Sequence, residues 1–210
     1  MNKVLVVSAG MIHPNWLARY HFSQLIKGMD GIQPVFTTSI QDLTRLATES
    51  FSAAVLYFHR SDISHEALSS LTQFVTQGGG LFAVHSASAS FKQTRGYFDI
   101  IGGRFVSHGK IEAYTIRPSG SAPDLFPGVQ AFSVKDELYI HEYQNDVNIH
   151  FFADNHGSDE PAVWTRTHGR GKVAYSAFGH CAKVMSVPQV QMIMEKCLLW
   201  VLTPCEDTPL

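Results

Sequence analysis

The chain has 210 residues, of which 45% are hydrophobic and 16% are charged. This balance is typical of a chain that folds around a hydrophobic core, and it argues against intrinsic disorder. The 16 Lys and Arg residues against 18 Asp and Glu residues give a formal net charge of -2. A dominant role in nucleic-acid binding is therefore disfavoured, because neutralising phosphates requires a basic surface. No apolar run approaches the length needed to span a bilayer, so we expect no membrane-spanning segment.

The cysteines and the N-terminal sequence favour a cytoplasmic protein. The widely spread Cys181, Cys197 and Cys205 form neither a disulfide framework nor a zinc ribbon. The N-terminus has a short apolar run but lacks the length and the small-residue cleavage site of a signal peptide. A reducing cytoplasm fits these features. Because no repeat, low-complexity segment or linker interrupts the chain, we expect one domain over residues 1–210.

The first 90 residues alternate between strand and helix patterns. Continuous apolar runs predict strands over residues 3–8, 32–37, 53–59 and 81–85. Between them, helices are predicted over residues 16–27 and 41–48, and from Ser64 to the glycine run at 78–80. This order implies right-handed crossovers and a parallel sheet covered on both faces.

The rest of the chain has a different pattern. Residues 105–155 are rich in strand and loop signals and show few helical stripes. Two strands, at 162–167 and 172–178, flank the turn sequence HGRG and predict a hairpin. A final helix begins at Pro188, buries one apolar stripe and ends before Pro204.

The fourth predicted strand ends in a sequence that favours a functional residue. In AVHSA, residues 83–87, small residues lie two positions before and two after His85. Strand-to-helix elbows need small flanks because the turn is tight, and open α/β sheets bind ligands beyond the carboxyl ends of their strands. A structural histidine bonded to a loop carbonyl remains the alternative. Ser86 either contributes to ligand binding or caps the following helix.

The chain resembles the ThuA-like (trehalose-utilisation) family in five blocks that occur in the family's order. The first block is GGGLFAVHSA at residues 78–87. The others are IGGRF at 101–105 with His108, DELY at 136–139, PAVWTR at 161–166 with GRGKV at 169–173, and FGH at 178–180. The matches extend from about residue 3 to residue 202, which is nearly the whole chain.

The resemblance implies an α/β fold of the class I glutamine amidotransferase-like type, a variant of the flavodoxin-like, doubly wound, mostly parallel sheet. It also implies a loose association with sugar metabolism, although a fold does not fix a reaction. True glutamine amidotransferases need an elbow cysteine, whereas this elbow holds His85 and the first cysteine of the chain is Cys181. A thioester mechanism needs a low-pKa thiolate, so we exclude glutaminase activity.

In the resembled fold, several polar residues from distant segments can converge above one sheet edge. Imidazoles titrate near neutral pH, and a carboxylate can orient them, so such a set suits general acid–base chemistry. The expected catalytic residues are His85, His108, Glu137 and His180. The same donors suit a divalent metal, so a metal cofactor stays open.

Further candidates for ligand binding are His13, Ser86, Arg104, Asp136 and Trp164. Each has a structural alternative: a loop surface position for His13, a tether for Arg104, a loop cap for Asp136 and core packing for Trp164. Asp136 and Glu137 are neighbours, and we expect one of the pair to be functional.

The sequence therefore predicts a protein that acts on, or binds, a small carbohydrate or sugar derivative. One alternative is a divalent-metal-dependent hydrolase or isomerase. Another is a non-catalytic sugar-binding or assembly module. Formation of a homo-oligomer stays open, with phenylalanines of the middle region as apolar contacts if they do not belong to the core.

Overall fold

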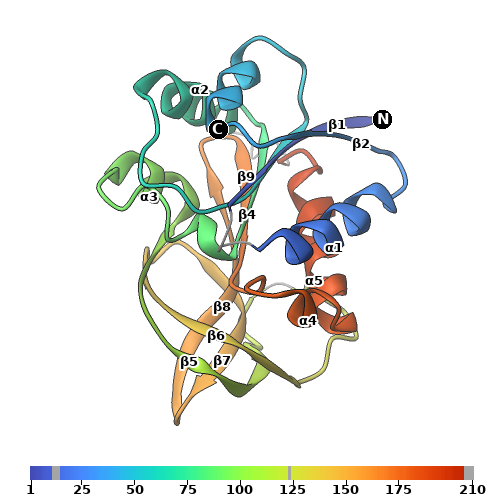
Figure 1. The fold of residues 1–210 in the computed structure, drawn as a ribbon, viewed down its shortest axis with the longest axis vertical. Coiled ribbons are helices and arrows are strands. Elements are labelled where there is room, and N and C mark those ends of the chain that lie inside the picture. Colours follow the sequence, from blue (N-terminus) through green and yellow to red (C-terminus); the bar gives the residue numbers. More distant parts are fainter. Residues whose placement is uncertain (11–14, 123, 206–210) are drawn as a thin grey trace.

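A computed structural model describes residues 1–10, 15–122 and 124–205. Its strands are β1 (Asn2–Ala9), β2 (Ile32–Thr37), β3 (Ala53–Phe58), β4 (Gly80–Val84), β5 (Gly103–Pro118), β6 (Phe132–Tyr143), β7 (Asn148–Asn155), β8 (Ser158–His168) and β9 (Gly171–Ser176). Its α-helices are α1 (Trp16–Lys27), α2 (His65–Thr76), α3 (Arg95–Ile101), α4 (Ala182–Met185) and α5 (Pro188–Val201), with 3-10 helices η1 (Ile40–Ala47) and η2 (His85–Ala87). The strands form one nine-stranded sheet in the order β2-β1-β3-β4-β9-β8-β7-β5-β6 (Figure 1).

The parallel half of the sheet consists of β2, β1, β3, β4 and β9. Side chains of a strand alternate between the two faces of a sheet, and the apolar runs of this half fill both. On β1, Val4 and Val6 join a core that includes residues of α1 and α5, whereas Leu5 and Val7 join a core with residues of α2 and α3. Helices therefore cover both faces of the parallel strands, as Figure 1 shows.

The second half of the sheet is antiparallel, which corrects one expectation. Strand β8 pairs with β9 and β7, and β5 pairs with β6 and β7, all in antiparallel register. The α/β class is confirmed, but the sheet is mixed rather than mostly parallel. Two-residue connections join β7 to β8 and β8 to β9, and connections this short force antiparallel pairing. The longer segment between β5 and β6 also returns antiparallel. A flavodoxin-like topology of the parallel half stays a prediction.

The helix boundaries follow the capping residues seen in the sequence. The Asn15 side chain accepts a hydrogen bond from the Ala18 amide at 2.8 Å, and the Ser64 hydroxyl accepts one from the Ala67 amide at 3.1 Å. The expected helix over residues 41–48 forms as the 3-10 helix η1 instead. Its buried residues, Leu43 and Leu46, are three apart, and a 3-10 helix places such residues on one face.

Close contact between α5 and the start of β4 gives a first testable prediction. A Cβ built on Gly80 would lie 2.1 Å from the backbone oxygen of Val201. The substitution Gly80→Ala should therefore lower the free energy of unfolding by about 2 kcal/mol or more, because rigid backbone must move. Gly109 is the matched control, since its Cβ would meet nothing within 4 Å. Urea unfolding measures both variants, and equal loss in the two would contradict the prediction.

Candidate functional site

His85 lies at the end of β4 in a backbone conformation that is unusual for a residue with a side chain. Its φ is 46°, in the left-handed region, and its side chain is fully buried. The ring atom Nδ1 lies 2.7 Å from the backbone oxygen of Ala177. A carbonyl oxygen only accepts hydrogen bonds, so Nδ1 carries the proton of the neutral ring. The lone pair of that ring is consequently on Nε2.

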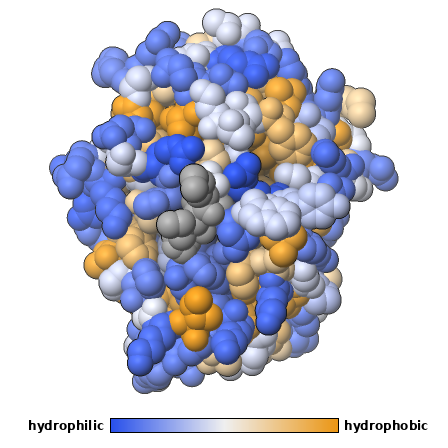
Figure 2. Space-filling model, in the orientation of Figure 1, coloured by the Kyte–Doolittle hydropathy of each residue, from blue (hydrophilic) through white to orange (hydrophobic). Residues whose placement is uncertain are grey.

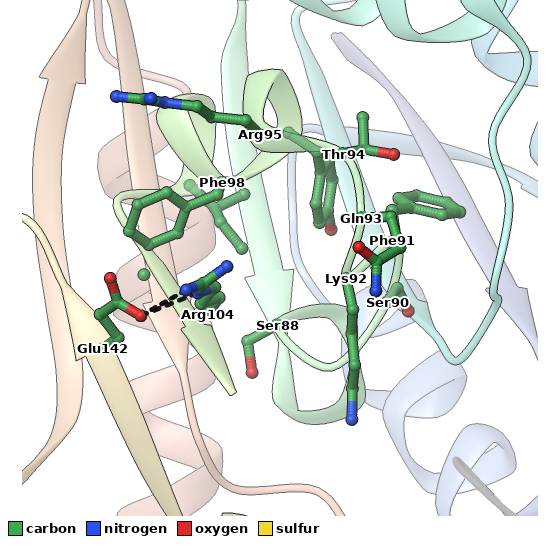
Figure 3. Close-up of a pocket in the computed structure, with 13 residues that line it drawn as sticks. Ser88, Ser90, Phe91, Lys92, Gln93, Thr94, Arg95, Phe98, Arg104 and Glu142 are labelled. Carbon is green, nitrogen blue, oxygen red and sulfur yellow. Dashed lines mark hydrogen bonds and ion pairs between the residues drawn. The ribbon is translucent and has the colours of Figure 1, made fainter. Parts of the chain in front are cut away.

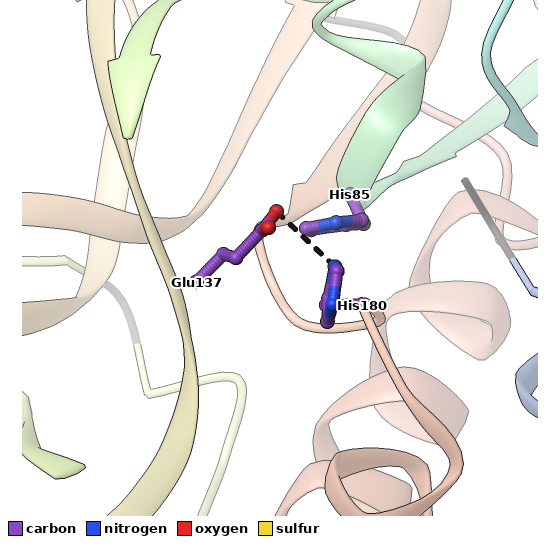
Figure 4. A group of neighbouring side chains, drawn as sticks. All are labelled: His85, Glu137 and His180. Carbon is purple, nitrogen blue, oxygen red and sulfur yellow. Dashed lines mark ion pairs between the residues drawn. The ribbon is translucent and has the colours of Figure 1, made fainter. Parts of the chain in front are cut away.

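Three side chains from separate segments meet at this point. Glu137 comes from β6, His85 follows β4, and His180 follows the end of β9 (Figure 4). Their potential ligand atoms all lie within 4.8 Å of one another. His180 Nδ1 forms an ion pair with Glu137 Oε2 at 3.1 Å, and the two side chains are 17% and 9% exposed. The cluster is therefore mostly buried, and His180 is the more solvent-exposed member of this pair.

Asp136 adds a fourth polar group next to this cluster. Its side chain is fully buried. Burial raises the pKa of Asp136 to about 7, although the backbone N–H groups of Glu137, Gly179 and His180 oppose the rise by favouring the ionised form. The carboxyl group therefore titrates near neutral pH, in the range that general acid–base chemistry uses.

Tyr139 lies between two of the expected catalytic histidines. Its ring stacks on His85 with centroids 4.2 Å apart and lies parallel to His108 at 6.0 Å. His108 itself is exposed on β5, and its Nδ1 lies 2.8 Å from the Gly109 oxygen. His108 is thus separated from the His85–Glu137–His180 cluster by one aromatic ring.

Irregular pairing of β5 with β6 accounts for this placement. Between the pairs His108–Tyr139 and Ile111–Glu137, β5 advances three residues while β6 advances two. A β-bulge of this kind bends the strand and redirects side chains. It leaves four consecutive residues of β6, from Asp136 to Tyr139, buried, where a regular strand at a sheet edge would alternate.

The remaining expected ligand-binding residues do not share one location. Ser86 is fully buried beside His85. Arg104 forms an ion pair with Glu142 at 2.6 Å and lines a separate pocket of about 410 Å³ between the segment after η2, α3 and β5 (Figure 3). Trp164 is fully buried and donates a hydrogen bond to the Ile101 oxygen at 2.9 Å, which supports the core-packing alternative. His13 lies outside the described residues.

Sequence reasoning missed a buried polar network beneath His85. The Ser88 and Tyr175 hydroxyls lie 2.8 Å apart, and both lie 3.1 Å from the backbone oxygen of His85. His141 Nε2 lies 3.0 Å from the Tyr175 oxygen, and its Nδ1 faces Glu160 at 3.4 Å. Burial lowers the pKa of His141, so this imidazole is neutral. The only signal in the sequence was that His141 follows the DELY block at residues 136–139. This did not distinguish His141 from the other histidines of the chain.

The arrangement can perform two kinds of chemistry. Nε2 of a neutral His85 can accept a proton from a bound hydroxyl, with His180 and Glu137 as a polarised pair beside it. Alternatively, two imidazoles and one carboxylate can hold a divalent metal. A hydrogen bond from the second ring nitrogen to a backbone carbonyl, as His85 makes to Ala177, is typical of metal-ligating histidines.

Titration of Asp136 predicts a pH dependence of stability. An aspartate in an unfolded chain has a pKa of ~3.9, whereas that of folded Asp136 is about 7. Between these values the folded state holds a proton that the unfolded state has released, so stability falls as pH rises through this window. We expect Asp136→Asn to remove that slope in protein kept free of metal with a chelator.

The measurement is the free energy of unfolding in urea at several pH values between ~4 and ~8, spanning the two pKa values. Asp124→Asn, at an exposed aspartate, is the control and should keep the slope of the unchanged protein. An identical pH profile for the Asp136 variant and the unchanged protein would show that Asp136 is ionised throughout.

Among the described residues, no helix is both long enough and apolar enough to cross a bilayer.

None of the curated proteins matches the chain. Solved structures do match. A ThuA-like protein from Parabacteroides merdae has a TM-score of 0.81 at 17% identity, over 99% of this chain and 93% of its own. A ThuA-like protein from Bacteroides uniformis has a TM-score of 0.76 at 16% identity, over 95% and 91%. A cytoplasmic protein from Salmonella typhimurium has a TM-score of 0.67 at 15% identity, and the match covers 96% of this chain and 97% of its own.

These similarities to solved structures establish the fold, and the family follows from the sequence. The family model for ThuA, described as trehalose utilisation, matches residues 3–201. This match includes every described residue of the His85–Glu137–His180 cluster and both halves of the sheet. The chain belongs to the ThuA family.

Proposed function

We propose that the protein binds a carbohydrate or sugar derivative at the His85–Glu137–His180 cluster and acts on it by general acid–base chemistry. The observation that carries this proposal is the meeting of the three side chains within 4.8 Å, together with a family described as trehalose utilisation. A sugar offers hydroxyl groups that both donate and accept hydrogen bonds, which matches a mixture of imidazole and carboxylate.

The roles follow from the hydrogen bonds of each group. His85 is the general base, because the hydrogen bond of its Nδ1–H to the Ala177 oxygen holds the ring in the tautomer whose Nε2 accepts a proton. Glu137 orients His180 through their contact at 3.1 Å, so that the imidazole can donate a hydrogen bond to a substrate oxygen. Asp136, with a pKa of about 7, is a buried group beside this pair.

Other attributes belong to the same proposal. One continuous sheet supports the assignment of a single domain, and the similar Salmonella typhimurium protein is described as cytoplasmic, which supports that location for this chain. Arg104 and His108 lie outside the cluster. We assign them to the surroundings of the site rather than to the reacting atoms.

Substitution of the two histidines tests the proposal. His85→Ala and His180→Ala should each lower turnover of a carbohydrate substrate by about 100-fold or more, because the proton acceptor or donor is lost. A panel of glycosides, including trehalose, supplies the substrates, and product release is followed by chromatography. The control is His65→Ala, at an exposed histidine on α2.

Two results would redirect the assignment. If both cluster variants turn over substrate like the unchanged protein, the reacting site lies elsewhere. If sugars bind saturably but none is converted by the unchanged protein, the chain is a binding module.

A divalent-metal-dependent hydrolase or isomerase is the second candidate. It is favoured by the His/His/Glu donor set and by the bond of His85 to a backbone carbonyl, which would fix Nε2 toward an ion. A bound metal would act as a Lewis acid or activate a water molecule. In this case His85, His180 and Glu137 would hold the ion, and Asp136 would stand beside it as a proton acceptor.

Metal analysis separates the two candidates. Protein prepared without an affinity tag should contain about one equivalent of zinc or manganese per chain if the metal chemistry is right, and Glu137→Gln should lose it because a charged ligand is removed. Elemental mass spectrometry measures the content, and calorimetric titration with zinc measures affinity in the chelated protein. Absence of metal both as prepared and on titration excludes this candidate and leaves acid–base chemistry.

A further inference from the structure

We propose that a groove along α1 is a second carbohydrate subsite, which receives the neighbouring sugar unit of a ligand held at the His85–Glu137–His180 cluster. This inference rests on the proposed function for the class of ligand. The groove, of about 680 Å³, lies between α1 and the carboxyl ends of β1 and β2. It is a separate cavity from the pocket that Arg104 lines.

The first argument is a pair of exposed aromatic side chains. Trp16 and Tyr20 line the groove and are 72% and 54% exposed. They are four residues apart and therefore neighbours on one face of the helix. The core contacts of α1 are made instead by Ala18, Phe22 and Ile26. Neither aromatic side chain is thus needed for packing, and aromatic rings with a polar edge are suited to binding surfaces.

The second argument is the presence of unsatisfied polar groups among the residues that line the groove. Ser8, on β1, is 7% exposed. In the described part of the chain, its hydroxyl has no hydrogen-bond partner, and neither does Nε of Arg19. Buried polar atoms without partners are costly, but both atoms are inaccessible to solvent, so a ligand in the groove can reach them only if the lining side chains shift. The Arg19 guanidinium group is held in position by its Nη1, which donates a hydrogen bond to the Gly10 oxygen at 2.9 Å.

The third argument is the connection to the cluster. The Asn15 side chain, one residue before Trp16, donates a hydrogen bond to the backbone oxygen of His180 at 3.2 Å. The start of α1 is therefore tied to the segment that carries His180. Trp16, at the near end of the groove, is therefore next in sequence to a residue that contacts the backbone of His180.

The chemistry of the groove favours a carbohydrate over a protein surface. Ser23, Gln24, Thr37 and Thr38 supply hydroxyl and amide groups around the two aromatic rings, and the Lys27 ammonium covers the ring of Phe36 at 5.4 Å. Figure 2 shows hydrophilic and hydrophobic residues interleaved on this view of the molecule rather than one continuous apolar patch. Faces of sugar rings are apolar while their rims carry hydroxyls, which matches an aromatic wall with polar edges.

Calorimetric titrations with glucose, maltose and trehalose test the subsite. The unchanged protein should bind one disaccharide at least tenfold more tightly than glucose. Trp16→Ala and Tyr20→Ala should each lower the affinity for the disaccharide by about tenfold and leave the affinity for glucose unchanged, because only the second sugar unit loses its stacking face. Trp16→Phe should retain most of it. Tyr143→Ala, at an aromatic residue that is 41% exposed and outside the groove, is the matched control.

A second readout follows Trp16 directly. Trp164 is fully buried and Trp200 is half-buried, so acrylamide quenching of the chain's tryptophan fluorescence reports mainly on Trp16. The disaccharide should protect this emission, whereas glucose should not.

Several outcomes overturn the inference. These are no preference for a disaccharide, binding of no carbohydrate at all, or alanine variants that keep the preference. A dimer of the unchanged protein that Trp16→Ala converts to monomer assigns the groove to contact between copies of the chain. The proposed function fails separately: if His85→Ala and His180→Ala turn over substrate normally while Trp16→Ala loses the disaccharide preference, the groove stands and the cluster assignment falls.

Discussion

The left-handed backbone at His85 is the constraint on which the site depends. Such a conformation costs on the order of 1–3 kcal/mol for a residue with a side chain, so the surroundings must hold it. They do so from two sides, since the Ser88 and Tyr175 hydroxyls bind the His85 backbone oxygen and the Ala177 oxygen binds the ring. Both the position of the residue and the direction of Nε2 are thereby fixed before any ligand arrives.

The antiparallel half of the sheet supports this constraint. Tyr175 stacks on Trp164 with centroids 4.0 Å apart, and His141 packs edge-on against both rings. His141 is tethered in turn by Glu160, whose carboxylate accepts from the His141 amide at 2.8 Å. A chain of hydrogen bonds and stacked rings therefore extends from the antiparallel strands to the elbow. Trp164 is fully buried within this packing.

Much of the parallel half could be predicted from sequence because its signals are local. The apolar runs of the strands, the caps Asn15 and Ser64, and the glycines before β4 each act within a few residues. The convergence of His85 and His180 was expected only from the resemblance to the ThuA-like family, and the parallel pairing of β4 with β9 accounts for it. Glu137 was also expected from the resemblance, but its burial was not, because that burial depends on a β-bulge opposite, in β5, and no pattern within β6 reveals it. The same bulge leaves His108 on the surface, behind Tyr139.

The proposed site draws on both halves of the sheet: His85 and His180 follow strands of the parallel half, and Glu137 lies on a strand of the antiparallel half. His85 is held at the elbow by hydrogen bonds to its backbone and ring, whereas Glu137 comes from a strand whose register depends on its pairing with β5. Changes in the β5–β6 pair can thus move Glu137 and Tyr139 relative to a fixed His85 without disturbing the parallel core. Under the proposed function, the antiparallel strands and α1 would select the ligand, whereas the parallel half would position the proposed base, His85.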